Sequence, residues 1–138
     1  MTKPMPGEFL DTNVLIYAFT DDSRSHKAQE LLARGCTIGV QVLNEFTNVA
    51  RRKLKMNWGE VGDALSSIRI LCPTVVPMDL DIHDEALVIA ERYGLQIVDA
   101  LMVASAKHCR CDVLWSDDMQ DGMIIDDRLQ IIDPFRLP

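Results

Sequence analysis

The chain has 138 residues, 48% of them hydrophobic, and a formal net charge of −7. No apolar run approaches the roughly 20 residues of a membrane-spanning helix, and the acidic balance argues against non-specific binding of nucleic acid over the whole surface. The length predicts a single domain over residues 1–138. Because the first residues lack the apolar stretch of a signal peptide, we expect a cytoplasmic protein without a membrane partner.

The cysteines and histidines do not form a recognisable metal or nucleophilic site. The cysteines are not arranged as the two spaced pairs of a four-cysteine zinc site (Cys36, Cys72, Cys109 and Cys111). We therefore expect reduced thiols in the core or at its edge. No serine lies at a recognised catalytic spacing from any histidine, so all three are interpreted as surface or core residues (His26, His83 and His108).

Predicted strands and helices alternate through the first half of the chain. They are a strand at residues 8–10, helices at 14–19 and from about 25 to 32, a strand at 37–40 and a helix that begins near 42. Ser23 or Ser25 is expected to cap the second helix, and Gly35 to end it.

The second half continues the alternation. Its predicted elements are a helix at 58–71, a strand at 74–76, helices at 82–93 and 100–107, a strand at 112–116 and an edge strand at 129–132. Asp81 and Asp99 are expected to cap the two later helices, and Gly94 to end the first of them. This alternation predicts a three-layer α/β/α sandwich, with helices covering both faces of a mostly parallel sheet.

Two of the predicted strands end at acidic residues. Asp11 follows the first strand, and Asp117 and Asp118 follow the strand at 112–116. Ligands of open parallel sheets bind beyond the carboxyl ends of the strands, so both positions suit a functional site. Each also has a structural alternative, which is a helix cap for Asp11 and a turn, reinforced by Asp121-Gly122, for the later pair.

Glu45 and Asp99 are predicted to lie on helices close to the same edge. Glu45 falls between the apolar stripe of its helix and a polar strip, where a half-buried carboxylate needs a cation or a hydrogen-bond donor. Its alternative is an ion pair with an arginine. Asp99 precedes the apolar run ALMVA, so an acid at that position is held near the sheet, and its alternative is again a helix cap.

Together the four acids predict one metal site. Four clustered carboxylates would raise one another's pKa values unless a divalent cation is bound. Oxygen ligands without matching histidines favour Mg²⁺ or Mn²⁺ over zinc. Asn13 is interpreted as a cap that could also orient Asp11 or a water.

The same residues resemble the PIN-domain nucleases, especially the VapC-type toxins of bacterial type II toxin–antitoxin pairs. The similarity covers nearly the whole chain and rests on the order and spacing of several segments. They are FLDTNVLIY at 9–17, VLNEF at 42–46, DALMVASA at 99–106, SDD at 116–118 and DPF at 133–135.

The resemblance implies a set of site residues and a reaction. Asp11, Glu45, Asp99 and Asp118 would bind Mg²⁺ or Mn²⁺, and Asp117 or Asp121 remains an alternative to Asp118. Asn13 and Ser116 would orient ligands or water, and Arg52 would touch the RNA backbone. The implied reaction is the hydrolysis of RNA phosphodiester bonds by an endoribonuclease, with a homodimer and a small antitoxin as partners.

Other functions remain open at this point. A PIN-type nuclease of RNA processing would carry the same acids, and a PIN fold retained only for binding would not need all four. An aspartyl-phosphate phosphatase expects a second aspartate where Asn13 stands. A receiver-like domain with an acidic pocket expects adjacent acids after the first strand and a lysine after a late strand, and neither is evident.

Overall fold

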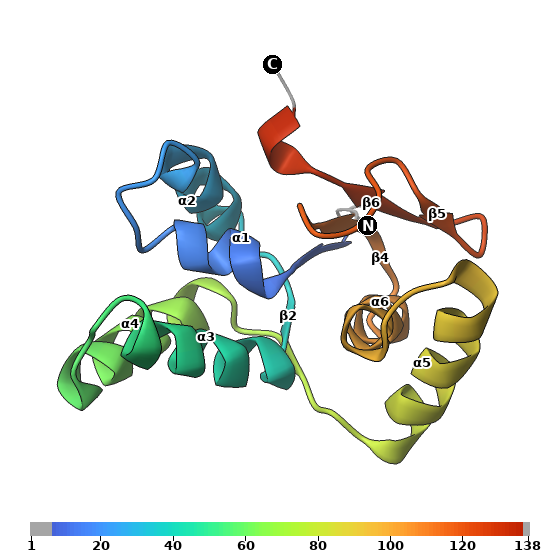
Figure 1. Ribbon diagram of the computed structural model, residues 1–138, viewed down its shortest axis with the longest axis horizontal. Helices are drawn as coiled ribbons and strands as arrows, with labels where there is room; N and C mark the ends of the chain where they lie inside the picture. The colour runs from blue at the N-terminus through green and yellow to red at the C-terminus, as the bar shows by residue number, and fades with distance from the viewer. Residues whose placement is uncertain (1–6, 137–138) are drawn as a thin grey trace, which may run out of the picture.

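The computed structural model describes residues 7–136 and has six α-helices packed around a mostly parallel sheet (Figure 1). Four strands pair in the order β1 (Gly7–Leu10), β4 (Cys111–Trp115), β6 (Leu129–Ile132) and β5 (Ile124–Ile125). Only β5 runs antiparallel to its neighbour. A second, parallel pair is formed by β2 (Ile38–Gly39) and β3 (Val75–Val76).

The two groups of strands are joined at β1. Thr37 forms a parallel bridge with Phe9, and its backbone N–H donates to the Glu8 carbonyl over 2.8 Å. The Leu10 N–H donates to the Thr37 carbonyl over 3.1 Å. The six strands therefore follow one another in the order β3-β2-β1-β4-β6-β5, and the first five run in the same direction.

Helices cover both sides of this sheet, which confirms the predicted three-layer α/β/α sandwich. In Figure 1, the earlier helices of the chain lie to the left and the later ones to the lower right. The first four are α1 (Thr12–Tyr17), α2 (Ser25–Ala33), α3 (Val40–Arg52) and α4 (Trp58–Leu71). The other two are α5 (Leu80–Tyr93) and α6 (Ile97–His108), and a short 3-10 helix, η1 (Pro134–Arg136), follows β6.

The core explains why these segments take these forms. On α3 the buried side chains recur every fourth residue, at Val42, Phe46 and Ala50, which gives the helix one apolar stripe. Five consecutive residues of α6, from Met102 to Ala106, are buried, as the apolar run predicts. The described cysteines are free, and three of the four are buried. All three histidines are exposed. No described helix is long and apolar enough to span a bilayer.

Several predicted helix boundaries are wrong by about two residues. The helix expected at 14–19 spans Thr12–Tyr17, because Asp11 caps it by accepting the Thr12 N–H. Neither Ser23 nor Ser25 caps α2, because Asp22 instead accepts the Arg24 N–H just before the helix. Two further caps also fall earlier than expected. Asp79 caps α5 in place of Asp81, two residues later. The N-cap of α6 is Gln96, three residues before Asp99, so Asp99 lies in the first turn of the helix.

The last strand is also placed differently from the prediction. β6 is not an edge strand, because it pairs with β4 on one side and with β5 on the other. The edge strand is β5, which has only two residues and is therefore too short to show an alternation of apolar and polar residues. Asp126 and Asp127, both with positive φ, form the turn between β5 and β6.

Candidate active site

Asp11 lies at the carboxyl end of β1 and is 5% exposed. Both of its carboxylate oxygens accept hydrogen bonds: Oδ1 from the Thr12 N–H over 2.6 Å, and Oδ2 from the Ser116 hydroxyl over 2.6 Å. Burial raises the pKa of Asp11 to about 7, although the hydrogen bond from Ser116 has the opposite effect and lowers it. The charges of Asp118 and Asp99 raise this pKa further. Asp11 is thus both the cap of α1 and a buried acid that faces other acids.

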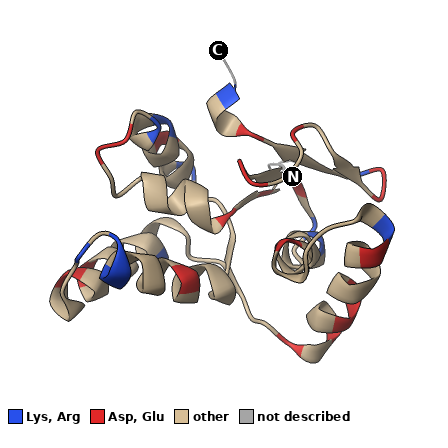
Figure 2. Cartoon of the chain, in the orientation of Figure 1, with Lys and Arg blue, Asp and Glu red and all other residues tan. Residues whose placement is uncertain are grey.

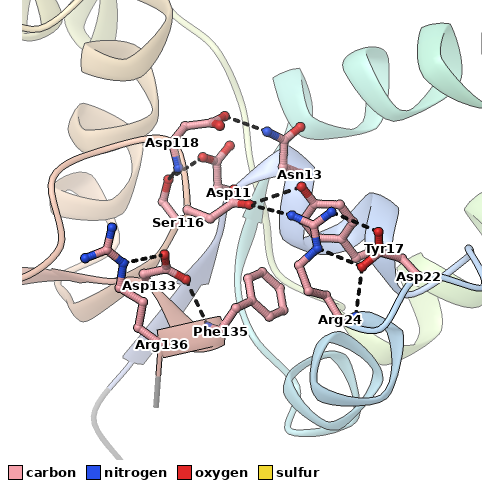
Figure 3. A network of polar contacts seen from close by, with 11 residues as sticks. Asp11, Asn13, Tyr17, Asp22, Arg24, Ser116, Asp118, Asp133, Phe135 and Arg136 are labelled. Carbon is pink, nitrogen blue, oxygen red and sulfur yellow. Dashed lines mark hydrogen bonds and ion pairs between the residues drawn. The ribbon is translucent and has the colours of Figure 1, made fainter.

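Ser116 reaches Asp11 because β1 and β4 are neighbouring parallel strands. Leu10 is in register with Trp115, so the residues that follow them meet at the same edge of the sheet. The Ser116 side chain is completely buried, and its Oγ also accepts the Asp118 N–H over 3.2 Å. This serine therefore links Asp11 to the backbone of Asp118 (Figure 3).

Asp118 faces Asn13 across the mouth of the site. The Asn13 side-chain amide donates to Asp118 Oδ2 over 2.7 Å (Figure 3). Partial burial and the charges of Asp117 and Glu45 raise the pKa of Asp118, and the Asn13 bond lowers it. Asn13 is two residues beyond Asp11 on α1, so it fixes the second acid relative to the first.

Glu45 approaches the same place from α3. It is half-buried beside Val42 and Phe46, which agrees with its predicted position between the core and the polar strip. Its Oε2 accepts the Thr12 hydroxyl over 2.9 Å. Its Oε1 is buried and has no hydrogen-bond partner among residues 7–136. The expected alternative, an ion pair with an arginine, is not formed within the described part of the chain.

Asp99 completes the group from the first turn of α6. It is half-buried, and burial is the main reason that its pKa is raised. The next two causes are the charges of Asp118 and Glu45. The four predicted acids thus come from four separate parts of the chain, and the charges of other acids in the group help to raise the pKa values of Asp11, Asp99 and Asp118.

The donor set fits a hard divalent cation. All of these side chains offer oxygen atoms, and Glu45 has a buried carboxylate oxygen without a donor. Burial and then repulsion between the acids raise the pKa values of Asp11, Asp99 and Asp118, and a bound cation would offset both effects. In their present rotamers, no three His, Cys, Asp or Glu side chains of residues 7–136 already meet at the spacing of metal ligands. Binding would therefore need side-chain rotation by the more exposed acids.

The two alternative acids have partners that Asp118 lacks. Asp117 Oδ2 accepts the Tyr17 hydroxyl over 3.1 Å and lies 3.8 Å from the Arg24 guanidinium, whereas Asp117 Oδ1 is buried without a hydrogen-bond partner among residues 7–136. Asp121 is exposed and accepts the backbone N–H of Asp133 over 2.8 Å.

Tyr17 and Arg24 form a network that the sequence did not indicate. The Arg24 guanidinium lies 3.9 Å from the centre of the Tyr17 ring, and Phe135 packs edge-on against the same ring (Figure 3). Asp22 holds Arg24 through two side-chain bonds of 2.7 and 2.8 Å. The network ties α1, the residues before α2 and the C-terminal η1 to the residue beside Asp118. Only the DPF segment pointed to this region, and nothing in it indicated a contact with Tyr17.

Arg52 is not brought to the acids. It is the last residue of α3, is exposed, and lies seven residues beyond Glu45, about 10 Å along the helix axis. Arg51 and Arg52 form the last turn of α3, and Figure 2 shows a basic segment where that helix ends. If Arg52 contacts RNA, as predicted, it does so at a distance from the four acids.

Comparison with known proteins identifies the fold. The model of the PIN domain family matches residues 9–123. A chain of a toxin–antitoxin complex from Klebsiella pneumoniae aligns over 95% of this chain and 100% of its own length, with a TM-score of 0.73 and 18% identity.

Two further solved structures share the fold. VapC20 of Mycobacterium tuberculosis, described as a sarcin-ricin loop cleaving toxin, aligns over 81% of this chain and 92% of its own, with a TM-score of 0.61 and 19% identity. A chain of VapBC2 from Rickettsia felis, solved bound to a DNA fragment from their promoter, aligns over 91% of this chain and 98% of its own length, with a TM-score of 0.62 and 21% identity. No curated protein matches the sequence significantly. Because the family model covers most of its length, the chain belongs to the PIN domain family.

Proposed function

We propose that the protein is a metal-dependent endoribonuclease and the toxin of a toxin–antitoxin pair. The observation that carries the proposal is the group of four acids at one edge of the sheet, with the buried Glu45 Oε1 left without a donor. Membership in the PIN domain family and the structural similarity to toxin–antitoxin proteins support it.

In this proposal each side chain has a defined role. Asp11, Glu45, Asp99 and Asp118 hold Mg²⁺ or Mn²⁺. Mg²⁺ or Mn²⁺, when bound, supplies an activated water near neutral pH and positive charge for the phosphate. Ser116 and Asn13 keep two of the carboxylates turned toward the site through bonds of 2.6 and 2.7 Å.

Thr12 orients a third acid. Its hydroxyl donates to Glu45 Oε2, which leaves Oε1 as the oxygen available to a cation. Thr12 also donates its backbone N–H to Asp11, so a single residue fixes one oxygen on each of two acids. Positioning of this kind is a main source of rate in phosphodiester hydrolysis, because the developing charge meets groups that are already oriented.

The direct test is cleavage of single-stranded RNA by the purified protein with Mg²⁺ or Mn²⁺. We expect cleavage that excess EDTA abolishes and that returns when the metal is restored. Asp99→Asn should remove cleavage without unfolding the protein, as judged by circular dichroism. Asp63→Asn, at an exposed acid of α4, is the matched control and should cleave normally. Full cleavage in EDTA, or by Asp99→Asn, would overturn the metal mechanism.

The partners are tested separately from the chemistry. If the protein is a toxin, its induced expression in a bacterium should arrest growth, and co-expression of its small antitoxin should restore it. Normal growth with soluble, cleavage-competent protein would favour an RNA-processing nuclease instead. The proposal includes a cytoplasmic homodimer, which sedimentation equilibrium of the purified protein would test.

A further inference from the structure

A cleft opens beside two of the four acids. It has a volume of about 560 Å³ and is lined by Asp99 and Asp118. The other lining residues are 93–96, Met119, Gln120 and Met123. One wall is the connection between α5 and α6, and the other is the segment between β4 and β5. A ligand in this cleft would lie directly next to the carboxylate group.

The lining is suited to a flat, polar-edged ligand rather than to phosphate. Gln96 and Gln120 contribute two exposed side-chain amides to this lining. Gln96 is the N-cap of α6 but makes no side-chain cap bond. Each amide offers one acceptor and two donor hydrogens, which is the combination that reads the edges of nucleobases.

The rest of the cleft is apolar or acidic. Met119 is buried, Leu95 and Met123 are half-buried, and no Lys or Arg is among the described lining residues. Tyr93 adds an aromatic ring that is fixed by two 3.0 Å bonds with Asp126, one donated by its hydroxyl and one accepted from the Asp126 N–H. Without a cation of its own, the cleft cannot neutralise phosphates, whereas aromatic and thioether groups pack against bases.

We propose that this cleft binds one unpaired base adjacent to the RNA phosphate that is cleaved, and that Gln96 and Gln120 recognise the hydrogen-bonding edge of that base. The inference rests on the proposed ribonuclease function and adds a specificity site to it. Base-specific recognition of RNA acts mainly on unpaired bases, which explains why an open cleft at the acids is suited to single-stranded RNA. In this arrangement the acids, through a bound metal ion, would bind the phosphate, and the cleft would select the neighbouring nucleotide by its base.

The test measures binding separately from cleavage. Glu45→Gln protein, altered at an acid that does not line the cleft, is mixed with Mg²⁺ and fluorescent single-stranded tetranucleotide pools. Each pool has one base fixed at one position, and affinity is measured by fluorescence anisotropy. The same measurement is repeated with Gln96→Ala and Gln120→Ala added singly, and Gln130→Ala, at an exposed residue of β6, is the matched control.

We expect a preference for particular bases at one position of the tetranucleotide. Gln96→Ala or Gln120→Ala should lower the affinity for the preferred pool by roughly 5- to 150-fold, and Gln130→Ala should leave it unchanged. If Glu45→Gln protein shows no base preference, or if that preference is unchanged in each of the two glutamine variants, the base site is overturned. If wild-type protein does not cleave RNA in Mg²⁺ or in Mn²⁺, the ribonuclease function is overturned instead, so the two failures are distinguishable.

Discussion

Replacement of Ser116 by alanine tests the polar framework of the site at its most buried point. The hydroxyl donates to Asp11 Oδ2 over 2.6 Å and accepts the Asp118 N–H over 3.2 Å, and the side chain is 0% exposed. A hydrogen bond to a charged group contributes roughly 1.5–3 kcal/mol. Its loss should therefore weaken Mn²⁺ binding by about 10- to 150-fold, similar to the effect of removing other groups that orient metal ligands.

The pH dependence gives the same substitution a second readout. The pKa of Asp11 is about 7, and the Ser116 bond lowers it, so Ser116→Ala should raise it further. Because a protonated carboxyl binds metal poorly, the pH at which Mn²⁺ binding is half-maximal should rise. Titration calorimetry between pH 6 and 9 measures both quantities on the purified protein.

The control for Ser116→Ala is another buried serine. Ser105 is 3% exposed and donates to the Leu101 carbonyl within α6 over 2.9 Å, with no bond to any acid. Ser105→Ala should match the loss of a buried hydroxyl without changing Mn²⁺ affinity or its pH midpoint. Equal Mn²⁺ affinity and equal midpoints in wild type and Ser116→Ala would refute the role given to this serine.

Four further substitutions examine the acids of the site and the residues that support them. Asp118→Asn should remove cleavage, and Asp117→Asn should retain most of it; the reverse order of rates would move the fourth acid to Asp117. Tyr17→Phe keeps the ring beside Arg24 but removes the 3.1 Å bond to Asp117, so it should lower the free energy of unfolding by about 1–2 kcal/mol in urea, and an unchanged value would contradict the network. In EDTA, wild type should lose stability relative to Asp11→Asn as the pH rises from 5 to 7.5, because a carboxyl whose pKa is raised to about 7 by burial binds more protons when folded. Parallel stability curves for the two proteins would contradict that sign.

The sequence allowed a mostly parallel sheet, and the helix or strand end near which each acid lies, to be predicted. Alternation of strands and helices leads to parallel strands, and parallel strands bring Asp11 and Ser116 to one edge whatever the details of the loops. The helical spacing of Val42 and Phe46 was enough to place Glu45 at the border of the core. These features depend on the local spacing of apolar residues, which can be observed in a single sequence.

The features that could not be predicted depend on contacts between distant residues. Tyr17 meets Asp117 across a separation of 100 residues, and no pattern around either residue indicates the other. The strand β5 is two residues long, too short for alternation to be visible, and it is held by pairing with β6. Likewise the side chain of Asp22, outside the helix, replaced the serine caps expected for α2.

Charge pairing separates Asp11, Glu45 and Asp99 from the other acids of residues 7–136 that are at least half-buried. Each of those others forms an ion pair, as Glu8 does with Arg34 over 2.6 Å and Glu85 with Lys107 over 2.8 Å. Within residues 7–136, none of the site acids forms an ion pair, although each is at least partly surrounded by protein or by other acids.

Helix capping cannot account for this arrangement. A cap needs one carboxylate near backbone N–H groups, as Asp79 shows on α5, and it does not need a second acid nearby. At the site, donors are supplied one at a time by Thr12, Asn13 and Ser116, which orient the carboxylates without neutralising them. An uncompensated group of this kind is stable only if a cation is bound or if some acids are protonated, as the raised pKa values indicate. Since a divalent ion needs several carboxylate oxygens that are not already neutralised, this group of unpaired acids is the strongest structural argument for the proposed metal-dependent function.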